Sequence, residues 1–115
     1  MFGNKLETIE KLAAAKKGKR LISYTKSKDP DVKLAAIRGL GIAGGEDAVN
    51  TLVPLLKDDD PKVRAEVARS FGMIAQGVHF ETHTKAHLQD RLKIEEDEMV
   101  IEAIREALSH MVGKE

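Results

Sequence analysis

One short motif recurs along the chain at a fixed spacing. Residues 29–33 read DPDVK, and residues 60–64, 31 positions later, read DPKVR. The same spacing aligns apolar residues on either side of the motif, and after the second copy it grows to 37, aligning Val63 with Val100. Repeats of this length indicate one supersecondary unit per copy. Such units stack on one another because none can bury its apolar face alone.

Each copy predicts two helices joined by a turn. The aspartate caps the first helix, and the proline suits its first turn, where a missing N–H costs nothing. Apolar residues then recur at helical spacings of three and four, and glycines at 44–45 and 77 end the first helices of two units. No segment alternates apolar and polar residues as a strand would.

The pattern therefore predicts an all-α fold, an α-α superhelix of about seven helices in three antiparallel hairpins plus a final helix at about 97–112. A chain of 115 residues fits one domain with one modest core. We expect a single domain over residues 1–115, with units at approximately 1–28, 29–59, 60–96 and 97–115.

The repeated segments resemble HEAT repeats. The resemblance rests on the DPxV(K/R) start, on the small residues around Leu40-Gly41, and on the stretch AVNTLVPLLKDDD at residues 48–60. The short form is similar to that of phycobilisome-lyase-type proteins. The resemblance implies a right-handed HEAT-like solenoid with its second helices lining a concave face. It also implies a scaffold or adaptor that binds proteins, although some members are chromophore lyases, nucleic-acid binders or di-iron hydroxylases.

Two features depart from that family pattern. Pro54 stands inside the expected second helix of its unit, where a proline removes one backbone hydrogen bond and usually kinks the helix. We expect this helix either to bend or to become regular late, near Asn50. The second departure is the long turn at residues 77–83, where the six extra residues of the wider spacing belong.

Composition narrows the environment and the chemistry. Hydrophobic residues make up 42% and charged residues 33%, and no apolar run approaches the roughly 20 residues that cross a bilayer. The first residues show no apolar signal region, and the chain has no cysteine for disulfides or thiolate metal sites. We expect a cytoplasmic protein. Charge is uneven, because residues 1–40 carry ten lysines and arginines against four acids, and the remainder carries nine against fifteen.

The repeat spacing also predicts which residues face a partner. Positions between the core residues of the second helices form a ridge that runs from basic to polar to mixed. The alternative is that these residues merely face water. The predicted partner-binding residues are Lys19, Arg20, Ser23, Asn50, Thr51, Pro54, His87 and Asp90.

Three histidines form a candidate metal site. His83 and His87 share a face if the segment is helical, and His79 lies one step before them, so the set could hold Zn²⁺ or Ni²⁺. The alternative is a polar insertion whose histidines pack on a neighbouring helix. The His-Glu dipeptides of the di-iron branch are absent.

A basic cluster stands at the turn of the first unit, at Lys16, Lys17, Lys19 and Arg20. It could meet phosphates, but it has no interleaved aromatic residues and no known reading motif, so a solvated turn is the simpler interpretation. The GLGIAG stretch at residues 39–44 falls late in a helix, where a nucleotide-binding fingerprint does not belong.

These observations favour a protein–protein interaction scaffold or adaptor module with no cofactor and no catalytic residues. The predicted partner is another protein, with a homodimer through the apolar C-terminal helix as one form and no membrane span. The alternatives are nucleic-acid binding through the basic first unit, or an accessory subunit of a lyase-like or metal-dependent enzyme. No nucleophile–base pair is visible in the sequence, which argues against an enzyme.

Overall fold

The fold is taken from a computed structural model, which describes residues 4–77 and 82–111. In these residues the chain forms seven α-helices, one short 3₁₀ segment and no strand, as the repeat pattern predicts. The elements in chain order are α1 (Asn4–Ala14), α2 (Gly18–Leu21), η1 (Ile22–Lys26), α3 (Pro30–Ala43), α4 (Glu46–Leu55), α5 (Pro61–Ala75), α6 (Thr82–Leu92) and α7 (Glu98–Ser109).

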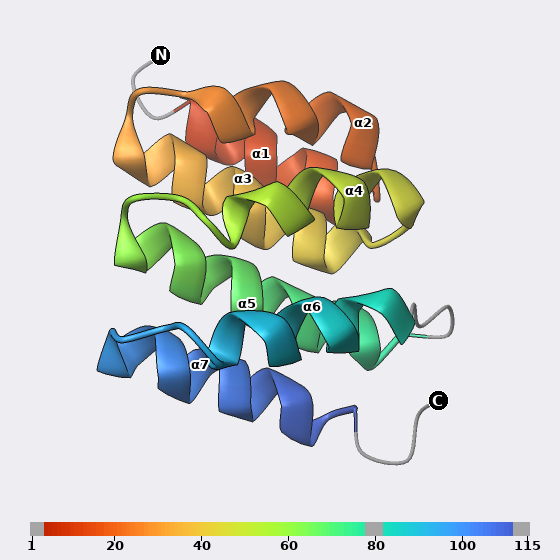
Figure 1. Ribbon diagram of the computed structural model, residues 1–115. Coiled ribbons are helices and arrows are strands. Elements are labelled where there is room, and N and C mark those ends of the chain that lie inside the picture. Colours follow the sequence, from red (N-terminus) through yellow and green to blue (C-terminus); the bar gives the residue numbers. More distant parts are fainter. Residues whose placement is uncertain (1–3, 78–81, 112–115) are drawn as a thin grey trace.

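The helices form two packed layers (Figure 1). The first layer holds α1, α3, α5 and α7 side by side, and the second holds α2 with η1, α4 and α6. The most extensive contacts in the described chain are those between neighbouring helices of the first layer. The molecule is therefore a short solenoid whose first and last units lie at opposite ends of the stack (Figure 1). None of the helices in the described ranges has the length and hydropathy needed to cross a membrane.

Equivalent positions of successive units supply the same core. Val32, Val63 and Val100 stand at one position near the start of α3, α5 and α7, and all three are buried. The largest buried side chain is Phe71, at the centre of the described stack. Burial at repeated positions explains why the 31-residue spacing is visible in the sequence at all, because each joint needs an apolar side chain at the same point.

Three aspartates start the long helices of the first layer. Asp29, Asp60 and Asp97 have extended backbone conformations, and each side chain accepts a hydrogen bond from the N–H two residues further on, at 3.0, 2.9 and 2.9 Å. A proline follows the first two caps, whereas Glu98 follows the third. The predicted start of the last helix is confirmed, and its end falls at Ser109 rather than at 112.

The second helix of the first unit is less regular than the repeat suggests. It consists of the single turn α2 followed by the 3₁₀ segment η1, not of one α-helix. Within η1 the Thr25 hydroxyl donates to the carbonyl of Ile22 at 2.6 Å, which favours the tighter turn. The turn before α2 contains Lys16 at φ 57°, a conformation that non-glycine residues rarely adopt.

Pro54 disturbs its helix less than expected. Helix α4 begins at Glu46, directly after Gly45, so the prediction of a late start near Asn50 is wrong. The proline lies in the last turn, and α4 ends at the next residue, Leu55. The hydrogen bond that proline cannot donate is therefore lost where the helix is about to end, which limits its cost.

Two ion-pair rungs tie the first-layer helices to the turns that follow. In the first rung, the Lys33 ammonium on α3 donates to Asp58 at 2.7 Å, and Asp58 also accepts the N–H of Asp60 at 2.9 Å. Burial alone would raise the pKa of Asp58, but these two hydrogen bonds and the positive charges of Lys33 and Arg64 together lower it.

The second rung repeats this arrangement one unit later. The Arg64 guanidinium on α5 makes two bonds to Glu95, at 2.9 and 3.0 Å, and Glu95 accepts the N–H of Asp97 at 3.1 Å. Burial by itself raises the pKa of Glu95, but Arg64, the N–H of Asp97 and Arg91 together lower it to about 2. Each rung thus fixes the start of the next first-layer helix.

Candidate functional site

The eight predicted partner-binding residues all lie on the second layer. Seven are exposed, and Thr51 is half-buried. Five of them line two hollows, whereas Ser23, Asn50 and Thr51 line neither of the two. One hollow includes Pro54, His87 and Asp90, and the other includes Lys19 and Arg20.

The first hollow is a groove of about 430 Å³ between α4 and α6. It is formed by two neighbouring units and has a largely apolar lining. The lining residues are Val53, Pro54, Leu56, Lys57, His87, Asp90, Arg91 and Ile94. The groove thus brings together three residues that the sequence placed in different units.

Ile94 is the most exposed aliphatic residue of this groove, and it is not among the residues predicted from the sequence. Its side chain is 66% exposed, the highest value among the exposed large hydrophobic residues of the described chain. It stands 37 positions after Lys57, so an apolar residue occupies a turn position that is charged in the preceding unit. This difference between two units of the repeat is the sequence signal that could have identified Ile94. An aliphatic side chain exposed at the edge of a groove is a candidate contact for a partner.

The charges around the groove are of two kinds. Arg91 is held in place, because its Nε donates to Glu95 at 3.0 Å. Lys57 and His87 are exposed, and Asp90 lies 3.6 Å from Lys93 at the surface, where such a pair contributes little. The arrangement offers an apolar surface beside one fixed cation, which suits binding of a polypeptide segment.

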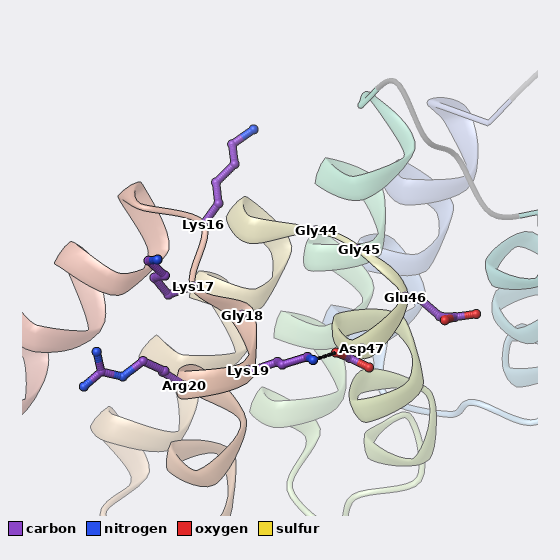
Figure 2. A pocket seen from close by; sticks show the side chains of 9 residues that line it. All are labelled: Lys16, Lys17, Gly18, Lys19, Arg20, Gly44, Gly45, Glu46 and Asp47. Carbon is purple, nitrogen blue, oxygen red and sulfur yellow. Dashed lines mark ion pairs between the residues drawn. The ribbon is translucent and has the colours of Figure 1, made fainter.

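The second hollow, of about 390 Å³, lies at the basic cluster (Figure 2). Figure 2 shows Lys16, Lys17 and Arg20 pointing in different directions, while Lys19 extends toward Asp47. The Lys19 ammonium lies 3.9 Å from the Asp47 carboxylate, and both side chains are largely exposed. Glu46 lines the same hollow. Four diverging cations beside two acids do not converge on one phosphate position, so this geometry favours the solvated-turn interpretation.

The predicted metal site falls largely outside the described part of the chain. His79 is not among the described residues, and the side chain of His83 is not described. His87 lies on the exposed face of α6, beside the groove. Among the described residues, no three histidine or acidic side chains are grouped as a metal ion requires. The His79–His83–His87 site stays a prediction.

The last helix, α7, has a polar outer side. Ser109 stands 37 positions after Gly72, the glycine of α5 against which α7 packs, and Glu102 and Arg105 are exposed beside it. Met99 is the exposed large hydrophobic residue of α7. Polar residues at the end of a solenoid replace the small residues of an internal joint. A homodimer through this helix stays a prediction.

A protein-family model of HEAT repeats matches residues 18–109, from α2 to the end of α7. The chain belongs to the HEAT-repeat family. The match covers HEAT repeats in general and does not single out the phycobilisome-lyase type. A comparison with curated proteins gives no match. HEAT repeats generally serve as protein-interaction scaffolds, so the family agrees with the kind of surface that the second layer offers.

Proposed function

We propose that this HEAT-repeat protein is an interaction module that binds a segment of a partner protein in the groove between α4 and α6. The observation that carries the proposal is the exposed Ile94 at the edge of a groove formed by two adjacent units. An aliphatic side chain from the partner would cover Ile94, and the ring of Pro54 and the side chain of Val53 would form the rest of the contact.

The geometry of neighbouring residues supports this choice of surface. Glu95, which also binds Arg64, anchors the Arg91 side chain at one wall of the groove, and an anchored side chain loses less entropy on binding. Asn50 and Thr51 lie about one turn before Pro54 on α4 and would flank a bound segment. Lys19, Arg20 and Ser23 belong to the first unit and would contact only a longer partner.

We expect Ile94→Asp to weaken binding at this groove by roughly tenfold or more, since a charge replaces the aliphatic contact. Peptides selected from a random display library against the wild-type protein provide the probe, and their affinities are measured by fluorescence anisotropy. Gln89→Asp, which places the same charge at an exposed position of α6 outside the groove, is the matched control and should leave affinity unchanged. A selection in which no peptide loses affinity for Ile94→Asp would contradict the proposal.

A further inference from the structure

Neighbouring helices of the first layer approach each other closely at glycines. A carbon added at Gly41 of α3 would lie 2.8 Å from Ser70 Cβ and 2.9 Å from Ser70 Cα on α5. A carbon added at Gly72, 31 positions later, would lie 3.3 Å from Ala107 Cα on α7. Real Cβ atoms essentially never come within 3.0 Å of such neighbours, so at Gly41 the close joint requires glycine.

In the joint between α1 and α3 the glycine stands on the other helix, since a carbon added at Gly39 of α3 would lie 3.4 Å from Ala13 Cβ on α1. The residue 31 positions before Gly41 is Glu10, which is exposed and lines a groove of about 400 Å³ between α1 and α3. A glutamate therefore stands on α1 where α3 and α5 each have a glycine. Glu10, which lines the groove, is thus a departure of the first unit from the repeat.

Two aliphatic side chains that line this groove are exposed to solvent. Leu6 on α1 is 39% exposed and Ile42 on α3 is 49% exposed, and both line the groove. The counterpart of Ile42 one unit later is Met73, which is half-buried and reaches over Gly41. On α1 the position that corresponds to Gly41 is Glu10, so Ile42 has no glycine to cover. Exposed aliphatic residues on both walls of a groove are the usual sign of a binding surface.

The edge of this groove is acidic. Glu10 and Asp31 both line it, and neither has an ion-pair partner among the residues that the structure describes. The third charged residue of the groove, Arg38, is already compensated, since its guanidinium makes two bonds to Glu66 at 3.3 Å. A bound segment would therefore meet two free carboxylates beside an apolar floor.

We propose that the α1–α3 groove is a second docking site, which takes a partner segment that carries an aliphatic side chain flanked by lysine or arginine. The aliphatic side chain packs between Leu6 and Ile42, and the flanking cations reach Glu10 and Asp31. This groove lies on the first layer, whereas the α4–α6 groove lies on the second (Figure 1). The protein can therefore hold two different segments at once, as an adaptor must.

The test uses two labelled peptides, one with a pair of leucines flanked by lysines, and one with glutamates in place of the lysines. We expect the wild-type protein to bind the lysine peptide at least tenfold more tightly in fluorescence anisotropy, with affinity falling as salt rises. Glu10→Lys should reverse the preference, and Ile42→Ser should weaken binding of the lysine peptide by about tenfold. Equal affinity of the wild type for both peptides, or an unchanged preference in Glu10→Lys, would overturn the proposal.

Two further measurements separate this site from the α4–α6 groove and from loss of folding. Ile94→Asp should bind the lysine peptide as the wild type does, because that residue lies in the other groove. In Glu10→Gln, which keeps the size of the side chain, thermal unfolding should be unchanged while the charge preference weakens. Backbone amide shifts on peptide addition should centre on α1 and α3, and shifts confined to α4 and α6 would refute the second site while leaving the first intact.

Discussion

Replacing Glu95 with glutamine is expected to lower the free energy of unfolding by about 3 kcal/mol at pH 7. The Glu95 side chain is 1% exposed and accepts bonds from Arg64, Arg91 and the N–H of Asp97. Glutamine has nearly the same shape but no charge, so two partly buried guanidinium groups lose their counter-charge. This is the largest electrostatic effect that the described part of the chain predicts.

The pH dependence of this effect has a definite sign. The pKa of Glu95 falls from 4.5 to about 2 on folding, so the folded state favours the ionised form. The stabilisation is complete above about pH 5 and is lost as the pH falls toward about 2. Chemical unfolding curves of the wild type and of Glu95→Gln should therefore converge between these values. Glu96→Gln, an exposed neighbour, serves as the control and should follow the wild type throughout. A stability difference that stays constant down to pH 2 would contradict the assignment.

The second large effect is expected at Gly41, where leucine should destabilise the fold by roughly 3 kcal/mol. Even one added carbon would lie 2.6 Å from Met73 Cε as well as against Ser70. Met73 can move, but the Ser70 backbone belongs to α5, so the two helices must separate. The Ser70 hydroxyl also donates to the carbonyl of Ile37 at 2.9 Å, and separation would break that buried bond.

The matched control places the same residue at the equivalent position of the first unit. Glu10→Leu should change the free energy of unfolding by less than about 0.5 kcal/mol, because that position is exposed beside an open groove. Thermal and urea unfolding of both variants measure the difference. Similar losses of stability at positions 10 and 41 would mean that residue 10 is packed as tightly as residue 41. That result would remove the basis for an accessible groove between α1 and α3.

Local signals in the sequence were enough to predict the architecture. The caps at Asp29 and Asp60 are followed by proline, and the apolar periodicity between them marks whole helices. Asp97 caps the last helix without a proline after it. Pro54 indicated a bent or late helix, but Gly45 starts α4 at Glu46 and the proline falls in its last turn.

The features that depend on contacts between units were not predicted. The Arg64–Glu95 rung joins residues that are 31 positions apart. Both lie in the unit at residues 60–96, whose length differs from that of the preceding unit. Ile94 and Glu10 each depart from the repeat, but neither departure has meaning until the distance between neighbouring helices is known. The partner-binding residues proposed from spacing lie on the exposed surface, and the division between two hollows came only from the structure.

Neither of the two ion-pair rungs includes a residue of the first hairpin, which consists of α1, α2 and η1. Ser27 stands where the later turns have Asp58 and Glu95, and it accepts the N–H of Asp29 without a cation to bind. The first joint therefore has no such ion pair among its described residues, although Gly39 of α3 lies against Ala13 of α1. In a chain whose stability is a sum over neighbours, such a joint is where local unfolding begins. A segment bound between α1 and α3 would couple its own affinity to the folding of that hairpin.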